Sequence, residues 1–264
     1  MYKLIEFKNK GGDTLRGIAT LAKSDTIALC LHGFERTAVT EKKFKVLADE
    51  LLKKNISSFR FDFTGTGLSD GDFKHTTVAS MADDLARAMH AISEYGKSMH
   101  IVAHSLGACV AAKYSHDNSV SFRSIVLLGP ALNQKELMRF WFALSSMKKN
   151  NPSVKITWDN YQGHLDEPAF SVDCARQDKM MKANYISADY FLENKEEDYG
   201  RAFVGMENVL HIHGDSDDKV PLQSITAHFS HRVIVNGGDH DCERPDMREQ
   251  WIEKVAAFIA ERGE

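Results

Sequence analysis

Ser105 lies in a pattern that suits a nucleophile. The heptapeptide VAHSLGA surrounds it, so that one apolar run turns into another at the serine. This pattern predicts a strand that turns sharply into a helix, with the serine in a strained backbone conformation. The small residues Ala103 and Gly107 let the strand and the helix pass closely. The turn also leaves the amide of Leu106 free at a helix N-terminus, where it can bind an oxyanion.

The alternative for Ser105 is a serine that only caps a helix. The usual nucleophile pattern has glycine two residues before the serine, where this chain has Ala103. A second oxyanion donor is predicted in the segment His32-Gly33-Phe34. Its glycine lets the chain turn after a strand, so that the amide of Phe34 points at a substrate oxygen. The alternative for this segment is a simple turn at a strand end.

Two further polar segments follow predicted strands late in the chain. The loop after residues 208–213 carries three aspartates, and one of them, Asp217, is placed to orient a histidine. The alternatives for these acids are solvation and capping of a following helix. His240 follows the last predicted strand and is placed to act as a general base, although a surface histidine is the alternative. The order serine, aspartate, histidine, each after a strand, favours the catalytic interpretation.

The elements that must position these residues alternate between strands and helices. Strands are predicted at 14–22, 26–31, 57–63, 99–103, 123–128, 208–213 and 232–236. Helices are predicted at 41–54, 77–95 and 106–116, from Pro221 onward, and at about 246–262. This alternation predicts an α/β fold with a mostly parallel central sheet and helices on both faces. The strand before Ser105 and the helix after it are apolar nearly all round, which places them in the middle of that sheet.

The alternation stops between residues 133 and 203. Aromatic residues there are scattered among charges, and paired apolar residues such as Met180-Met181 suggest short helices. A segment of this length is too long for a plain loop and should carry its own structure. We therefore predict one core domain, residues 1–132 and 204–264, with residues 133–203 as an insertion. The aromatic residues of the insertion could line a pocket or form its own small core.

Composition excludes several classes of function. The chain has 264 residues, is 43% hydrophobic and 27% charged, and carries a net charge of -4, which is typical of a globular protein without a field for nucleic acid. No apolar run is long enough for a membrane helix, and the charged residues 1–8 do not fit a signal peptide. The four cysteines form no C-x-x-C pair, so no metal site is predicted. These features predict a cytoplasmic protein, whose oligomeric state is not readable from the sequence.

The whole chain except the insertion resembles the α/β-hydrolase superfamily, and within it the small bacterial carboxylesterases of the feruloyl or cinnamoyl type. The resemblance is carried by five segments, which read HGF at 32–34, RFDFTGTGLSDG at 60–71, AHSLG at 103–107, HGDSDDKVP at 213–221 and GDH at 238–240. It implies that Asp217, four residues before the proline, is the acid rather than Asp215 or Asp218. It also implies that the inserted segment 133–203 is a lid that lies over the nucleophile.

Together these residues predict a serine hydrolase that cleaves carboxylic esters through an acyl-enzyme. Ser105, His240 and Asp217 would be the catalytic residues, and the amides of Phe34 and Leu106 the oxyanion hole, with no metal or organic cofactor. The expected partner is a small-molecule ester. The alternatives are a thioesterase, an amidase or a C–C bond hydrolase with the same three residues, or a non-catalytic binding protein on this fold.

Overall fold

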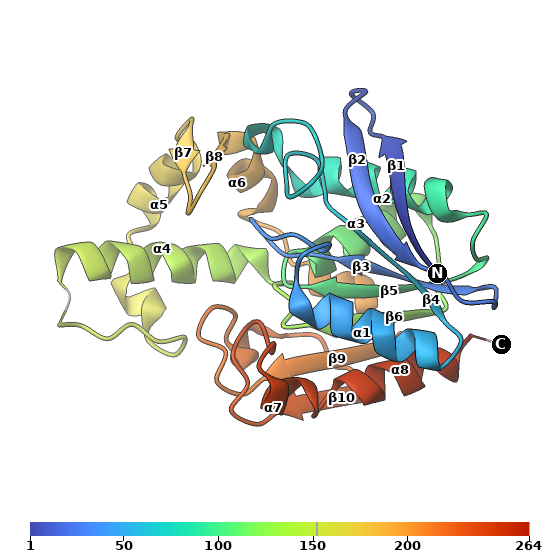
Figure 1. Ribbon diagram of the computed structural model, residues 1–264. Helices are drawn as coiled ribbons and strands as arrows, with labels where there is room; N and C mark the ends of the chain where they lie inside the picture. Colours follow the sequence, from blue (N-terminus) through green and yellow to red (C-terminus); the bar gives the residue numbers. More distant parts are fainter. Residues whose placement is uncertain (152, 264) are drawn as a thin grey trace.

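The computed structural model describes residues 1–151 and 153–263; Pro152, which falls in the predicted insertion, and Glu264 lie outside these ranges. Eight strands form one sheet in the order β1-β2-β4-β3-β5-β6-β9-β10. Their bounds are β1 Tyr2–Lys8, β2 Thr14–Thr20, β3 Thr26–Leu31, β4 Ser57–Phe61, β5 Ser98–His104, β6 Ser124–Leu128, β9 Val209–Gly214 and β10 His231–Val235. The strands from β4 to β10 are parallel, whereas β1 and β2 pair antiparallel at one edge (Figure 1).

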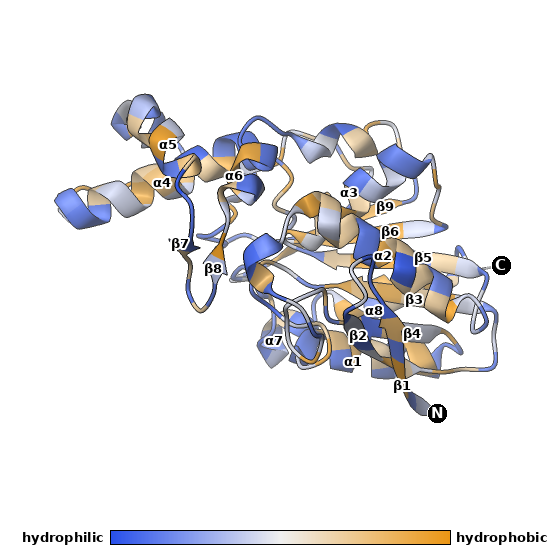
Figure 2. Ribbon diagram, turned by 90° about the horizontal axis from the view of Figure 1, so that it is seen from above, coloured by the Kyte–Doolittle hydropathy of each residue, from blue (hydrophilic) through white to orange (hydrophobic). Residues whose placement is uncertain are grey.

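Helices cover both faces of this sheet, which confirms the predicted fold class. The α-helices are α1 Lys42–Lys53, α2 Val78–Ile92, α3 Gly107–Asn118, α4 Gln134–Asn150, α5 Glu167–Cys174, α6 Ala188–Asn194, α7 Pro245–Arg248 and α8 Ile252–Ala260. Alternate residues of β5 separate the two layers, since Val102 packs in the cluster that contains α1 and α8, and Ile101 in the cluster that contains α2 and α3. Figure 2 shows hydrophobic residues concentrated along the central strands.

The strand before Ser105 occupies the centre of the sheet, as expected. β5 lies between β3 and β6, and its residues from His100 to His104 are buried. Such a strand has no free edge and no solvated face, which favours an apolar sequence, and its two buried histidines, His100 and His104, each have a hydrogen-bond partner. The predicted strands and helices up to residue 128 are all present with small shifts in their bounds.

Two predictions for the C-terminal third are wrong. The helix expected from Pro221 is only a 3-10 turn, η4 (Leu222–Ser224), because β-branched residues follow it and the ring of Phe229 packs on His211 instead. The single closing helix is two helices, α7 and α8. They are separated at Trp251, whose indole nitrogen donates a hydrogen bond to the carbonyl of Cys242. A tertiary contact decides the local structure in both places.

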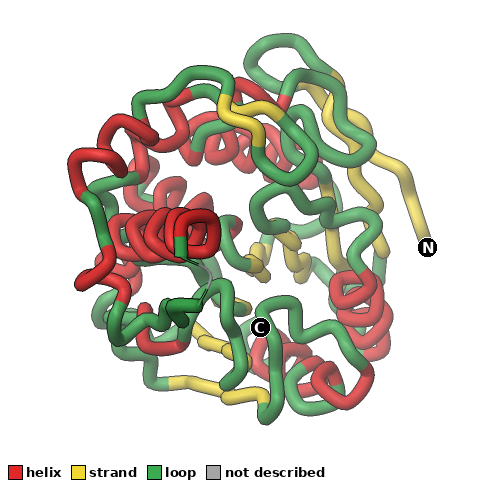
Figure 3. The backbone as a smooth tube through the Cα atoms, turned by 90° about the vertical axis from the view of Figure 1, so that its left-hand side faces the viewer, coloured by secondary structure: helices red, strands yellow, loops and turns green. Residues whose placement is uncertain are grey.

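The 133–203 segment has its own structure, which includes α4, α5, α6 and a small antiparallel hairpin of β7 (Lys179–Met180) and β8 (Tyr185–Ile186). The expected short helices are present as α5 and α6, but α4 has 17 residues, and the pair Met180-Met181 that suggested a helix lies at the hairpin, with Met180 in β7. Both ribbon views place the segment beyond the ends of the parallel strands, and Figure 3 shows α4 end-on in front of them. No helix among the described residues is long and apolar enough to cross a membrane.

The aromatic residues of the segment divide between two roles. Phe140, Trp158 and Tyr161 pack on one another in a cluster that belongs to the segment alone. Tyr190 instead contacts the ring of Phe34 in the core, at a centroid distance of 5.1 Å. The sequence left open whether the insertion forms a small core of its own, and this core is present. Tyr190 in addition contacts the loop of the predicted oxyanion donor Phe34.

Candidate active site

Ser105 occupies a tight turn between β5 and α3. Its φ is 53°, a left-handed conformation that costs a non-glycine residue free energy. A Cβ atom on Gly107 would lie 2.6 Å from the carbonyl oxygen of Leu31, and one on Gly33 would lie 3.0 Å from the Cβ of Ser105. Only glycine allows these close approaches. The predicted change from strand to helix is therefore present at the serine.

The structure brings Ser105, His240 and Asp217 together from three loops at one edge of the sheet. His240 Nε2 lies 2.9 Å from Ser105 Oγ, and His240 Nδ1 lies 2.8 Å from Asp217 Oδ2. All three residues are buried, whereas Asp215 and Asp218 are exposed. A neutral imidazole here donates from Nδ1 to the carboxylate and accepts the serine hydroxyl proton at Nε2, which is the arrangement a general base requires.

The Asp217 carboxylate is held in its charged form. Burial raises its pKa, but His213, His240 and the amide of Val220 outweigh this effect and bring the pKa below its ordinary value. Oδ1 accepts hydrogen bonds from the amides of Lys219 and Val220 at 3.0 and 2.8 Å. The loop after β9 therefore wraps its own backbone around the acid and leaves Oδ2 for His240.

The predicted oxyanion donors lie near the serine. No acceptor for the amide of Phe34 or Leu106 is found among residues 1–151 and 153–263. The loop that carries Phe34 is anchored by His32, whose Nδ1 contacts the carbonyl of Gly33 at 2.8 Å and whose Nε2 accepts a hydrogen bond from the amide of Phe63. Burial lowers the pKa of His32 to about 4, so this anchor stays neutral at physiological pH. Two free amides beside a buried hydroxyl can stabilise an oxygen that becomes negative.

His104, which directly precedes Ser105, contacts the loop of His240. Its Nε2 donates a hydrogen bond to the carbonyl of His240 at 3.1 Å, and the two rings lie 4.9 Å apart. Burial keeps the pKa of His104 well below its ordinary value. His104 therefore holds the backbone of His240, whose side chain contacts Ser105. A histidine inside a buried strand was the available signal in the sequence.

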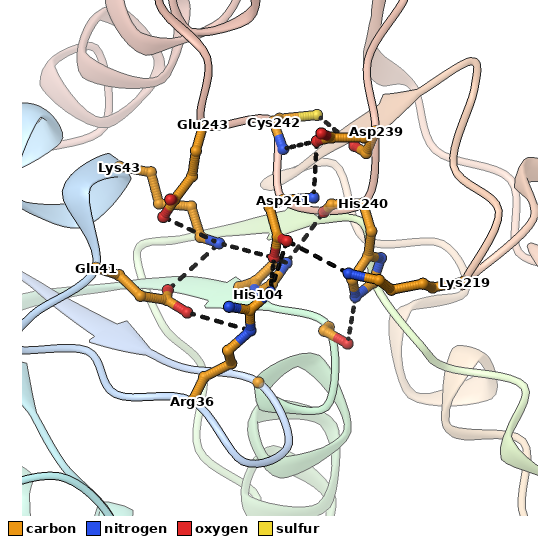
Figure 4. A network of polar contacts seen from close by, with 12 residues as sticks. Arg36, Glu41, Lys43, His104, Lys219, Asp239, His240, Asp241, Cys242 and Glu243 are labelled. Atoms are coloured by element: carbon orange, nitrogen blue, oxygen red, sulfur yellow. Dashed lines mark hydrogen bonds and ion pairs between the residues drawn. The ribbon is translucent and has the colours of Figure 1, made fainter. Parts of the chain in front are cut away.

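A buried network of charges behind His240 was missed entirely (Figure 4). Lys43 in α1 is fully buried, and its Nζ lies 3.3 Å from Glu41, 3.8 Å from Asp241 and 3.7 Å from Glu243. Arg36 also binds Asp241 at 2.6 Å. Burial favours the neutral form of Asp241, but Lys43 and Arg36 outweigh it and lower its pKa. The network anchors the residue that directly follows His240.

The cysteines do not rival Ser105. Cys109 and Cys242 are buried, and burial raises the pKa of each thiol, to about 12 for Cys242. The Sγ of Cys242 donates to the carbonyl of Asp239 at 3.1 Å rather than contacting His240. A thiol that stays protonated is a poor nucleophile. In the described part of the chain, no group of three or more potential ligands is arranged to hold a metal ion.

Residues 22–196 match the model of a family described as serine aminopeptidase, S33. No protein of curated function matches the sequence. Many solved structures share the fold. One of them is Est1E from Butyrivibrio proteoclasticus, solved with bound ferulic acid; it has a TM-score of 0.72, is 16% identical, and is matched over 97% of this chain and 98% of its own.

Two further structural neighbours are an esterase and a lipase. An esterase from Pyrococcus furiosus has a TM-score of 0.66, is 19% identical, and is matched over 100% of this chain and 92% of its own. A monoacylglycerol lipase from Paleococcus ferrophilus has a TM-score of 0.63, is 17% identical, and is matched over 94% of this chain and 99% of its own. At these identities the likeness shows the fold, and it confirms the predicted resemblance over nearly the whole chain.

Proposed function

Because the chain belongs to the serine aminopeptidase S33 family of α/β hydrolases, we propose that it is a serine hydrolase that cleaves carboxylic esters through an acyl-enzyme. The observation that carries this proposal is the unbroken chain of short contacts from Ser105 through His240 to Asp217. The fold and the family supply the hydrolase class. The ester specificity is supported by structural neighbours that are described as esterases and a lipase.

In the first step, Ser105 Oγ attacks the ester carbonyl while His240 Nε2 takes the hydroxyl proton. Asp217 holds the Nδ1–H tautomer and stabilises the imidazolium that forms. The amides of Phe34 and Leu106 bind the oxyanion, each contributing about 3 kcal/mol in the transition state. His240 then gives its proton to the leaving alcohol. The ester C–O bond breaks, and an acyl group remains on Ser105.

The second step repeats this chemistry with water. His240 takes a proton from a water molecule, whose oxygen attacks the acyl carbonyl and forms a second oxyanion at the same two amides. Collapse of this intermediate returns the proton to Ser105 and releases the carboxylic acid. Every proton in the cycle moves between the substrate, water and these side chains, so the scheme needs no metal and no organic cofactor.

The 133–203 segment is proposed to act as the lid of the site and to bind the acyl or alcohol group. Its position beyond the strand ends and the contact between Tyr190 and Phe34 support this role. The segment also contacts the loop that carries Asp217, because the indole nitrogen of Trp141 donates a hydrogen bond to the carbonyl of Lys219 at 2.6 Å. The segment thus contacts two of the loops that carry proposed catalytic groups, the loop of Phe34 and the loop of Asp217.

The variant Ser105→Ala tests the nucleophile. It should lower kcat for p-nitrophenyl esters by about 10⁵ or more, because removing a nucleophile of this kind leaves only binding and the oxyanion hole. Its far-ultraviolet circular dichroism should stay unchanged. A fluorophosphonate probe should label the wild-type protein at Ser105 and leave the variant unlabelled. Wild-type turnover in the variant would contradict the assignment, and the absence of both turnover and labelling in the wild type would favour a binding protein.

A second candidate is amide hydrolysis, which the family description itself favours. The same residues can expel an amine, since His240 would protonate the leaving nitrogen. We expect p-nitrophenyl acetate, longer p-nitrophenyl esters and methyl ferulate to be turned over faster than aminoacyl p-nitroanilides. The opposite ranking of kcat/KM would establish the second candidate in place of the first.

A further inference from the structure

Glu35, the residue after the proposed oxyanion donor Phe34, is bound to a segment far away in the sequence. Its carboxylate accepts hydrogen bonds from the backbone amides of Lys182, Ala183 and Asn184 at 3.1, 3.0 and 2.9 Å. The side-chain amide of Asn184 adds a fourth at 3.1 Å. These residues form the turn between β7 and β8. One carboxylate on the oxyanion loop therefore binds three consecutive backbone amides and one side-chain amide of a hairpin tip.

The backbone at Glu35 makes this contact specific. Its φ is 51°, in the left-handed region that a glutamate enters only when its surroundings hold it there. This conformation sets the direction of the chain just after Phe34. An alternative extended conformation at residue 35 would turn the preceding peptide groups. The orientation of the Phe34 amide and the seating of the hairpin tip are thus consequences of the same backbone torsions.

The neighbours of Glu35 are fixed from two other directions. The Phe34 ring packs between Tyr190 of α6, at 5.1 Å, and Phe73 of η1 (Phe73–His75), at 5.3 Å. Arg36 binds Asp241, the residue after His240, at 2.6 Å (Figure 4). Three consecutive residues therefore contact α6, the hairpin tip and the histidine loop. The contact at Glu35 consists of polar groups that are exposed or part-buried, so water can compete for its hydrogen bonds.

We propose that Glu35 is a positioning residue for the oxyanion hole: when the β7–β8 tip is seated on its carboxylate, the amide of Phe34 is held toward the developing oxyanion. The inference rests on the proposed ester hydrolysis and deepens it. The hairpin would thus stabilise the transition state from outside the reacting centre. The rival explanation is that Glu35 only closes the hairpin turn and so shapes the entrance for substrate.

The hairpin offers a matched control, because it has a second attachment to the core. Lys74 of η1 forms an ion pair with Asp178 at 2.6 Å, and its carbonyl accepts a hydrogen bond from the amide of Ser187 at 2.9 Å. Neither residue contacts the oxyanion loop in these interactions. Loss of the Lys74 ammonium therefore removes this second attachment and leaves the hydrogen bonds between the hairpin tip and Glu35 in place.

The test is steady-state hydrolysis of p-nitrophenyl acetate, whose acyl group is too small to need the lid for binding. Glu35→Ala should lower kcat by about tenfold or more, because a slightly misplaced oxyanion donor loses much of its effect, while KM changes by less than about twofold. Binding of a trifluoromethyl ketone, which forms a tetrahedral adduct, should weaken by a similar factor. Lys74→Met should keep kcat within about twofold of the wild type.

Glu35→Gln supplies the conservative comparison and a second variant if Glu35→Ala does not fold. Its Oε1 can still accept the three bonds that the structure places on that atom, so its kcat should fall between the wild type and Glu35→Ala. Hydrogen exchange should show loss of protection at the amides of residues 182–184 in Glu35→Ala. Three outcomes would overturn the proposal: an unchanged kcat in Glu35→Ala, a change confined to KM, or an equal kcat loss in Lys74→Met.

Failure of this proposal is separate from failure of the proposed function. If the wild type hydrolyses p-nitrophenyl acetate and Ser105→Ala does not, the function stands whatever Glu35 does. If the wild type is inactive on esters, the hydrogen-exchange and trifluoromethyl ketone measurements still report on Glu35. Loss of protection at 182–184 with unchanged ketone affinity would then show that Glu35 closes the turn and does not position the oxyanion amide.

Discussion

At the scale of single residues, the site depends on groups whose chemistry is set by what touches them. Asp217 shares its loop with two other aspartates, yet only its carboxylate is buried and bound by His240. Ser105 is one of many serines, yet it is held at a φ of 53° against that histidine. Contact and backbone conformation distinguish these residues from others of their type, so substitutions that keep size and change one contact are the sharpest tests.

Asp217→Asn is the residue-scale prediction. The variant should lower kcat by about 10³–10⁴, because the amide offers a donor toward Nδ1 and favours the wrong tautomer of His240. Asp218→Asn, one residue later and exposed, is the matched control and should keep wild-type kcat. Both variants are measured with p-nitrophenyl acetate under the same conditions. Equal losses in the two variants would refute the assignment of Asp217 as the acid.

At the scale of elements, α1 does more than cover one face of the sheet. Its Phe44, Leu47 and Leu51 pack in the apolar cluster that also contains α8. Lys43, in the first turn, points its ammonium into the carboxylates near His240 instead of into solvent. The helix therefore links the apolar layer to the loop of the proposed general base. Removal of one partner from a buried ion pair of this kind destabilises the folded protein by several kcal/mol, because the remaining charges stay buried without compensation.

Lys43→Met is the element-scale prediction. It removes the buried cation and leaves Glu41, Asp241 and Glu243 with fewer positive partners, so the free energy of unfolding should fall by about 3–5 kcal/mol. Urea unfolding measures the change, and the exposed neighbour substitution Lys42→Met should alter it by less than about 0.5 kcal/mol. Adding Glu41→Gln to Lys43→Met should recover part of the loss. The prediction fails if the two lysine variants have the same stability.

At the scale of the whole molecule, several histidines are buried in the core away from solvent. Burial lowers the pKa of His32 and His100 to about 4 and that of His211 to about 2. In the folded protein these rings stay neutral, whereas in the unfolded chain the same histidines bind protons below their ordinary pKa of about 6.5. The unfolded state is therefore favoured as the pH falls from about 6.5 toward 4. Asp84, whose pKa burial raises to about 6, acts in the opposite direction between about 6 and 4.

His100→Gln tests this dependence on pH. His100 lies within β5, and its Nδ1 contacts the Ser124 hydroxyl at 2.7 Å, a contact that glutamine can replace. The free energy of unfolding should fall less steeply between pH 6.5 and 4.5 in the variant, with a difference of about 2–3 kcal/mol over that range. Urea unfolding at several pH values measures both slopes. Parallel slopes in the variant and the wild type would show that His100 does not take part.

The sequence by itself determined most of the sheet and indicated the candidate site residues that the structure brings together. The turn at Ser105, the loop at Asp217 and the loop at His240 each carry their signal within about ten residues, because periodicity, glycines and strand ends are local properties. Only the tertiary structure decided the burial of Lys43, since a lysine in an amphipathic helix normally faces solvent. It also decided the seating of residues 182–184 on Glu35, almost 150 positions away. Such contacts depend on how elements that are distant in the sequence pack together, and no local sequence pattern predicts that packing.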